Sequence, residues 1–145
     1  MGKLDKKVAV ITGANSGIGA ATARLMADEG ASLVLGDINA DAAEELIAAC
    51  GGTERAIFVS VDVSNADQVE TLIATGVKHF GGLDILFNNA GIGTFGATEG
   101  LATDDWQRIL DIDLNSVFYG CRAAIPHLKA RRGGAIINTA SVSGM

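Results

Sequence analysis

The stretch that decides the fold is Thr12–Gly19, which reads TGANSGIG. It follows the run Val8–Ile11, whose unbroken apolar character is typical of a strand buried on both faces. It opens a helix that apolar residues at helical spacing predict from about Gly17 to Glu29. A glycine-rich turn between a buried strand and a helix predicts a phosphate site, because the free N–H groups at the helix start face the turn.

Three glycines of this turn have separate predicted roles. Gly13 permits the tight turn, Gly17 lets the backbone approach a pyrophosphate, and Gly19 lets the helix pack close to the sheet. Their spacing is G-x3-G-x-G rather than the standard G-x-G-x-x-G. The residues between them that complete the predicted cofactor-binding surface are Asn15, Ser16 and Ile18. A glycine triplet alone also fits an ordinary strand-to-helix turn, so the prediction depends on a partner elsewhere.

That partner is Asp37, which follows the second predicted strand, Ser32–Gly36, and lies 18 residues beyond Gly19. A carboxylate there can accept hydrogen bonds from both ribose hydroxyls of an adenosine. It would repel a 2′-phosphate, and no Arg or Lys between Gly13 and Ala23 compensates. NAD is therefore favoured over NADP. The alternative interpretation of Asp37 is a helix N-terminal residue or a loop carboxylate.

Strand and helix patterns alternate along the chain. Strands are predicted at Lys7–Thr12, Ser32–Gly36, Ala56–Val61, Leu83–Asn88 and Ala135–Thr139. Between them, helices are predicted at about Gly17–Glu29, Ala40–Cys50, from Ser64 or Asn65 to Phe80, and from Thr103 or Asp104 to Ala130. Pro126 should kink the last helix or mark a local break in it.

This alternation predicts one α/β domain over residues 1–145 with a doubly wound parallel sheet, Rossmann-like, in the order 3-2-1-4-5. The ligand crevice of such a sheet lies at the carboxyl ends of its first and fourth strands.

Composition argues against several classes of function. The net charge is −6 and no basic run exceeds two residues, which argues against nucleic acid or an anionic membrane as partner. No apolar run approaches the roughly 20 residues that cross a bilayer, and we expect no secretory signal. Cys50 and Cys121 stand 71 positions apart, and neither histidine is near them, so no metal site is predicted. We interpret both cysteines as reduced, buried thiols of a cytoplasmic protein.

From about residue 6 to residue 145, the chain resembles the classical short-chain dehydrogenase/reductase family. Thr12–Gly19 matches the family's T-G-x-x-x-G-I-G motif, and Asn88–Gly91 matches its N-N-A-G motif after the fourth strand. Asp62-Val63 matches its adenine-contacting pair. Further matches in the family's order are Asp104, Trp106, Leu114, Val117-Phe118 and the segment 136–141. The resemblance adds to the predicted cofactor site the residues Ile38, Asp62, Val63, Asn89, Ala90 and Gly91.

The resemblance implies hydride transfer between a nicotinamide ring and an alcohol or carbonyl carbon. In the family, a tyrosine exchanges the hydroxyl proton, and a lysine four residues on lowers its pKa and holds the nicotinamide ribose. A serine donates a hydrogen bond to the substrate oxygen, and Ser141 occupies its position. An asparagine on the long helix supports the lysine through water, but Asp113 stands at its position and, when ionised, only accepts hydrogen bonds. Asn115 lies about 200° around an α-helix from Asp113 and cannot replace it.

The sequence contains no Tyr-x-x-x-Lys pair. Its one tyrosine, Tyr119, precedes Ser141 and is interpreted as a helix residue packed at the edge of the core. We therefore expect a fragment of an NAD-dependent oxidoreductase, truncated after the catalytic serine, which binds cofactor without turnover. The loop Gly91–Phe95 would form one wall of the substrate site.

Two other interpretations stay open. The chain could be a non-catalytic NAD-binding module that pairs with another chain through the edge of its last strand. A methyltransferase would share the sheet, but its cofactor has no pyrophosphate, so the glycine turn together with Asn88–Gly91 disfavours it. The family resemblance also implies a small-molecule alcohol or carbonyl substrate for the complete protein. Family members are often dimers or tetramers, so a homo-oligomer is one alternative and the oligomeric state stays open.

Overall fold

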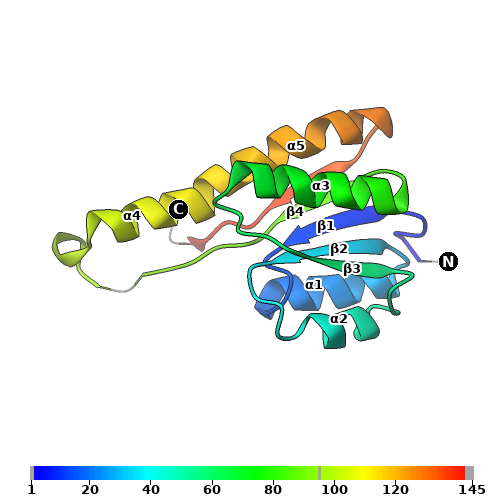
Figure 1. Ribbon diagram of the computed structural model, residues 1–145, viewed down its shortest axis with the longest axis horizontal. Helices are drawn as coiled ribbons and strands as arrows, with labels where there is room; N and C mark the ends of the chain where they lie inside the picture. The colour runs from blue at the N-terminus through cyan, green and yellow to red at the C-terminus, as the bar shows by residue number, and fades with distance from the viewer. Residues whose placement is uncertain (1, 95, 143–145) are drawn as a thin grey trace.

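Five parallel strands form the sheet of the computed structural model, which describes residues 2–94 and 96–142 (Figure 1). They are β1 (Val8–Thr12), β2 (Ser32–Asp37), β3 (Ala56–Ser60), β4 (Ile85–Asn88) and β5 (Ala135–Asn138). Their order is β3-β2-β1-β4-β5 with every pair parallel, which confirms the predicted topology.

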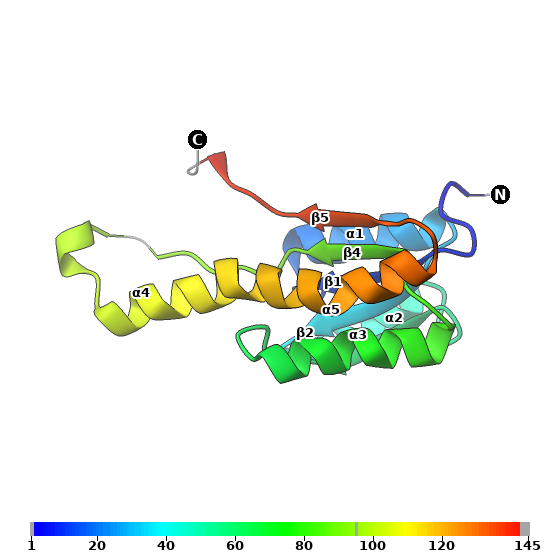
Figure 2. The same cartoon turned by 90° about the horizontal axis from the view of Figure 1, so that it is seen from above.

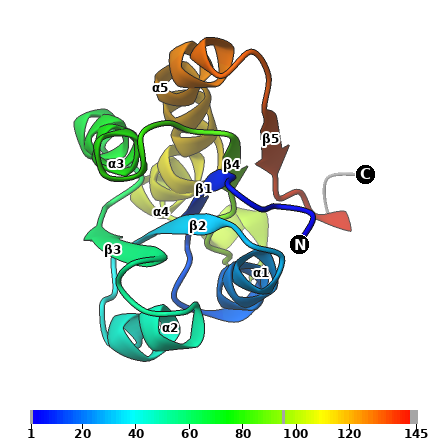
Figure 3. The same cartoon turned by 90° about the vertical axis from the view of Figure 1, so that its right-hand side faces the viewer.

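Helices cover both faces of this sheet (Figure 3). One face carries α1 (Gly17–Asp28) and α2 (Ala43–Ala49), and the other carries α3 (Ala66–Phe80) and α5 (Ser116–Ala130). The chain between β4 and α5 holds the short 3-10 helix η1 (Thr98–Gly100), then α4 (Thr103–Ile109) and a π-helical segment, η2 (Leu110–Asn115). None of the helices in the described part of the chain is both long and apolar enough to cross a membrane.

The central strand β1 divides its side chains between two cores. Ala9 and Ile11 pack into the core beneath α1 and α2, whereas Val10 packs into the core beneath α3 and α5. All five residues of β1 are buried, as its continuous apolar run predicted.

Local side-chain hydrogen bonds explain where several elements begin. Asn65 caps α3 by accepting from the N–H groups of Asp67 at 3.0 Å and Gln68 at 3.1 Å. Strand β4 begins two residues later than predicted, after Asp84, whose carboxylate accepts from the Val8 N–H at 3.0 Å and pairs with Lys7 at 3.4 Å. These contacts hold the strand beside the start of β1.

Helix α4, segment η2 and helix α5 form one rod that extends past the sheet (Figure 2). We expected a kink or break at Pro126, but α5 continues through Pro126 and the departure from α-helical hydrogen bonding lies earlier, in η2. Pro126 and Arg122 are both exposed, so water can bind the Arg122 carbonyl that has no N–H partner at Pro126.

Both cysteines are free, and their surroundings differ. Cys50 is buried at the end of α2, and burial raises the pKa of its thiol. Cys121 is only partly buried, on α5, so the expectation of two buried thiols holds for Cys50 alone.

Candidate functional site

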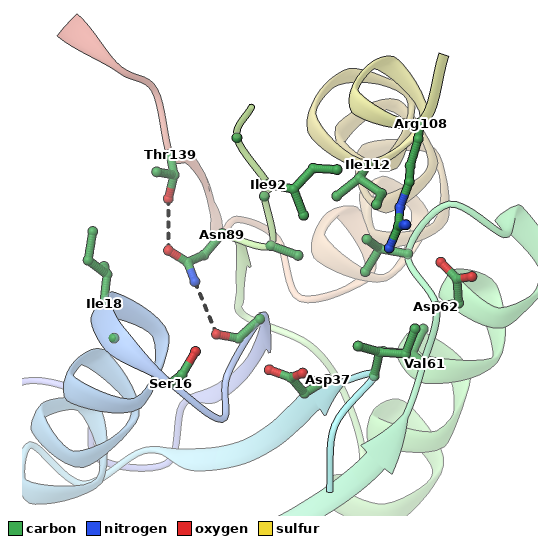
Figure 4. A pocket seen from close by; sticks show the side chains of 17 residues that line it. Ser16, Ile18, Asp37, Val61, Asp62, Asn89, Ile92, Arg108, Ile112 and Thr139 are labelled. Carbon is green, nitrogen blue, oxygen red and sulfur yellow. Dashed lines mark hydrogen bonds between the residues drawn. The ribbon is translucent and has the colours of Figure 1, made fainter. Parts of the chain in front are cut away.

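A pocket of about 550 Å³ lies at the carboxyl ends of β1, β2 and β4, where the strand order predicts the ligand crevice (Figure 4). Its size is in the range of small-molecule sites. Eleven of the predicted cofactor residues line it: Gly13, Ser16, Gly17, Ile18, Asp37, Ile38, Asp62, Val63, Asn89, Ala90 and Gly91. Their cofactor contacts stay predictions, but the fold gathers them around one cavity.

The glycine turn has the close packing that its sequence predicts. Gly13 has a φ of 61° and Gly17 a φ of 49°, which are left-handed values that favour glycine. A Cβ at Gly19 would meet the carbonyl oxygen of Gly13 and lie 2.9 Å from the Asn89 amide nitrogen. Gly19 is therefore buried beneath the turn, outside the lining of the pocket, and lets α1 begin directly against it.

The first turn of α1 keeps its N–H groups available. Ser16 stands at the N-cap with a φ of −150°, and no side-chain oxygen caps the helix there. Gly17 and Ile18 follow in the lining of the pocket. Uncapped N–H groups and the positive end of the helix dipole together form an anion-binding end.

Asn89 and Thr12 join the glycine turn to the end of β4. The Thr12 hydroxyl accepts from the N–H of Asn89 at 3.0 Å and from the N–H of Ala90 at 3.1 Å. The Asn89 amide donates to the carbonyls of Thr12 at 3.1 Å and Gly13 at 3.2 Å. Thr139, beyond β5, donates its hydroxyl hydrogen to the Asn89 side-chain oxygen at 3.1 Å (Figure 4). This network fixes the floor of the pocket.

Asp37 stands at the end of β2 with both carboxylate oxygens in use. Its Oδ2 accepts from the Asn15 N–H at 2.9 Å, and its Oδ1 accepts from the Asn39 N–H at 3.0 Å. The Asn15 side chain also donates to the Asn39 carbonyl at 2.7 Å, and its own buried Oδ1 has no hydrogen-bond partner among the described residues. Each Asp37 oxygen retains a second lone pair for a ligand hydroxyl.

At the end of the pocket beyond β3, apolar side chains surround the carboxylate of Asp62. Val61 and Val63 are buried there, while Ile38 also lines the pocket and is 70% exposed. Asp62 Oδ1 accepts from the Ser64 N–H at 3.0 Å and from the Ser64 hydroxyl at 2.7 Å. Asp62 Oδ2 has no partner among residues 2–94 and 96–142, so it can accept from a ligand.

The predicted catalytic positions lie outside the lining of this pocket. Asp113 is exposed, and its Oδ1 accepts from the Ile92 N–H at 2.8 Å, which ties η2 to the loop after β4. Asn115 donates to Asp111 Oδ1 at 2.8 Å and so does not take the place of Asp113. Ser141 is exposed, two residues beyond Thr139, which does line the pocket. Phe95, expected in the substrate wall, lies outside the described residues.

Sequence reasoning assigned no cofactor role to several lining residues. They are Val61, Ile92, Gly93, Arg108, Ile112 and Thr139. Arg108 and Ile112 share one side of the α4–η2 rod at a spacing of four, which was the available signal. Tyr119, by contrast, packs partly buried against the α3–α5 core, which confirms its predicted position.

The pocket thus combines N–H donors for an anion, acceptors for a pair of hydroxyls and an apolar slot. Within the part of the chain that the structure describes, no three His, Cys, Asp or Glu side chains gather as metal ligands would. The groups that line the pocket therefore suit an organic ligand that carries a phosphate and hydroxyl groups.

Comparison with known proteins gives concordant matches. A family model described as short chain dehydrogenase matches residues 7–145. A cyclohexanol dehydrogenase from Acinetobacter sp. (strain SE19) is 42% identical over 147 residues, which cover 99% of this chain and 58% of the relative. A trans-4-hydroxycyclohexanecarboxylate dehydrogenase from Sinomonas cyclohexanicum is 39% identical, with the same coverage of 99% and 58%. This chain therefore spans about three fifths of the length of these relatives.

A solved structure agrees with the sequence matches. A short-chain dehydrogenase/reductase from Burkholderia xenovorans superposes with a TM-score of 0.91 at 36% identity. The superposition covers 99% of this chain and 60% of that one. Over nearly its whole length, this chain therefore shares the fold of that protein.

Proposed function

The chain belongs to the short chain dehydrogenase family, and from that premise we propose that it binds NAD as the cofactor-binding part of an oxidoreductase acting on an alcohol or carbonyl substrate. The observation that carries the proposal is the Asp37 carboxylate, held at the edge of the pocket beside the uncapped first turn of α1. A carboxylate and a helix N-terminus bind opposite partners, a hydroxyl donor and an anion. The adenosine diphosphate half of NAD offers both.

The residues present fit the parts of NAD in order along the pocket. The pyrophosphate would bind the N–H groups around Gly17 and Ile18, and the adenosine ribose would bind Asp37. Asn15, whose buried Oδ1 lacks a donor among the described residues, lies on the same turn but outside the lining of the pocket. Adenine would lie in the apolar end beside Asp62, and the nicotinamide half would extend along 89–91.

Asp37 also supports NAD over NADP. A 2′-phosphate on the adenosine ribose would place two further negative charges beside a carboxylate, which is unfavourable at short range. The glycine turn carries no cation to offset that repulsion.

The proposed reaction is hydride transfer, in which bound NAD supplies the hydride acceptor. Ser141 would donate a hydrogen bond to the substrate oxygen, which polarises the reacting carbon–oxygen bond. Asp113 would position the loop at 91–92 through the Ile92 N–H. The 145 residues contain no Tyr-x-x-x-Lys pair to exchange the hydroxyl proton, so we expect them to bind NAD without turnover.

The names of two relatives suggest a substrate class. Both the cyclohexanol and the trans-4-hydroxycyclohexanecarboxylate dehydrogenases are named for alcohols on a six-membered ring. We extend the proposal to cyclic secondary alcohols as the substrate class.

We also propose that the protein works in a reducing compartment such as the cytoplasm, because both of its cysteines are free.

A second candidate function is a module that pairs with another chain. In the described part of the chain β5 pairs with β4 alone, and Ile137 on β5 is 42% exposed. An open strand edge with an apolar side chain can accept a further strand from a partner or from a second copy.

Calorimetric titration tests the cofactor class. We expect NAD and ADP-ribose to bind and S-adenosyl methionine not to bind. Binding of S-adenosyl methionine alone would contradict the proposal and favour the methyltransferase interpretation. Steady NAD-linked turnover by the 145-residue chain would contradict the proposed inactivity.

A chimera tests the reaction. The chain is joined to the part of the Acinetobacter cyclohexanol dehydrogenase that follows the matched region, which supplies that relative's own sequence there. We expect NAD-linked oxidation of cyclohexanol, abolished by Ser141→Ala. If the chimera with Ser141 folds and binds NAD but does not oxidise cyclohexanol, the result would favour the non-catalytic module.

A further inference from the structure

We propose that Arg108 recognises the purine base of the bound dinucleotide by laying its planar guanidinium over one face of the ring. The inference rests on the proposed function, since it assigns the adenine end of the same pocket. Arg108 comes from α4, beyond the sheet, and had no predicted role.

Arg108 projects from α4 toward the pocket, on the side of Ile112 and Asp62 (Figure 4). Of the Lys and Arg residues that the structure describes, it is the one that lines this pocket. Its guanidinium has no hydrogen bond and no carboxylate within the 4.0 Å limit of an ion pair among the described residues. Arg108 is also exposed, so its guanidinium can turn one face toward a ligand in the pocket.

The surroundings of Arg108 fit a flat aromatic ring. Ile38, Val61, Val63 and Ile112 give that end of the pocket apolar surfaces. The free oxygen of Asp62 provides one acceptor at its edge, and the exocyclic amino group of adenine is a donor. A guanidinium is planar, weakly hydrated and always charged, so it stacks on aromatic rings in a way that an ammonium does not.

A phosphate is the other chemistry that an arginine could bind here, and the charges disfavour it. Asp37 and Asp62 line the same pocket as Arg108, so an anion at this end would meet two carboxylates and one cation. The uncapped N–H groups of α1 lie at the glycine turn, which Gly13 and Gly17 line. The proposed pyrophosphate site is therefore at this turn and not beside Arg108. A neutral ring satisfies both the guanidinium face and the Asp62 acceptor.

The test is calorimetric titration of the 145-residue chain with ADP-ribose. Arg108→Ala removes the stack, Arg108→Lys keeps the charge without the plane, and Arg108→Gln is a second, polar replacement. Arg24→Ala is the matched control, since Arg24 is an exposed arginine of α1 that does not line the pocket. Circular dichroism and thermal melting establish that each variant is folded.

We expect Arg108→Ala and Arg108→Gln to weaken ADP-ribose binding by about five- to thirtyfold, within the range of base stacking. Arg108→Lys should regain less than half of the lost free energy, and Arg24→Ala should bind like the native chain. The loss should persist at 0.5 M salt, because stacking is screened far less than an exposed charge–phosphate contact. An Arg108→Lys variant equal to the native chain, with a loss that disappears in salt, would overturn stacking in favour of phosphate binding.

Replacing adenine by hypoxanthine separates the contribution of Arg108 to binding from the contribution of Asp62. Hypoxanthine keeps the ring and lacks the amino donor, so the native chain should bind the hypoxanthine analogue of ADP-ribose more weakly. Arg108→Ala should reduce binding of both ligands by the same factor, because the stack needs only the ring. A loss confined to the adenine ligand would overturn the proposal.

Failure of this inference differs from failure of the proposed function. If the native chain does not bind ADP-ribose, the dinucleotide site and the Arg108 assignment both fall. If it binds ADP-ribose and both Arg108→Ala and Arg108→Gln bind equally well, the dinucleotide site stands and Arg108 has no part in it.

Discussion

The backbone N–H of Asn15 donates to Asp37 Oδ2 over 2.9 Å, so the carboxylate at the end of β2 holds the glycine turn at the end of β1. The other oxygen, Asp37 Oδ1, accepts from the Asn39 N–H at 3.0 Å. One side chain therefore orders two loops and still faces the pocket. A ligand that uses Asp37 meets an acceptor already fixed in place, which lowers the entropy lost on binding.

Thr12→Val should destabilise the fold. The Thr12 hydroxyl is the acceptor for the N–H groups of Asn89 and Ala90, and Val cannot accept a hydrogen bond. Leaving partly buried donors unpaired costs about 1–3 kcal/mol, so urea unfolding should show a loss of that size. Thr12→Ser keeps the hydroxyl and should lose less. A Thr12→Val variant as stable as Thr12→Ser would contradict the role of this network.

Gly19→Ala should also be destabilising, because the added Cβ would meet the Gly13 carbonyl and the Asn89 amide. Forcing a methyl group into close-packed structure costs about 1–3 kcal/mol. Gly100→Ala is the matched control, because a Cβ there has no neighbour within 4 Å. Urea melts of both variants check the contrast, and equal stabilities would show that α1 does not depend on the close contact.

Asp113→Ala should release the loop after β4. Its carboxylate accepts from the Ile92 N–H at 2.8 Å, and Ala offers no acceptor. A net contribution of about 0.5–1.5 kcal/mol corresponds to roughly two- to tenfold faster hydrogen exchange at the Ile92 amide. Asp113→Asn keeps an acceptor and should retain most of the protection. Unchanged exchange in Asp113→Ala would exclude the positioning role.

Cys50 predicts a stability change at alkaline pH. Burial raises the pKa of its thiol, with Asp28 adding to the rise and Arg24 and Arg55 opposing it. The folded state therefore holds the thiol proton to a higher pH than the unfolded state, and stability should fall as pH rises above about 8.5. Cys50→Ala should remove that part of the slope in urea unfolding between pH 8 and pH 10. An identical slope in the native chain and in Cys50→Ala would contradict this contribution of the Cys50 thiol.

The topology could be predicted because its signals are local. The apolar run Val8–Ile11, the glycine turn and Asp37 each stand at a strand end, and parallel strands bring their carboxyl ends to one edge. The family motif added Asn89 at the end of the fourth strand, and the structure places it in a hydrogen bond with Gly13, 76 positions away.

The parts that sequence could not predict depend on contacts without a local signal. Ile109 and Ile112 have a spacing that fits an α-helix, so the π-helical segment η2 has no distinct pattern. The approach of Arg108 to the pocket depends on how far the α4–η2 rod extends past the sheet. The Asp113–Ile92 hydrogen bond joins residues 21 positions apart, and no local sequence pattern marks the pair.

The most direct test of the central claim compares NAD with NADP in the native chain and in Asp37→Ser. Ser keeps a small hydrogen-bonding side chain and removes the charge that would repel a 2′-phosphate. We predict that the native chain binds NAD at least tenfold more tightly than NADP by calorimetry, and that Asp37→Ser lowers this ratio to near one, mainly by weakening NAD binding. A native chain that binds NADP as tightly as NAD would contradict the assignment of this pocket as an NAD site. A ratio of NAD to NADP affinity that is unchanged in Asp37→Ser would contradict the assignment of that selectivity to Asp37.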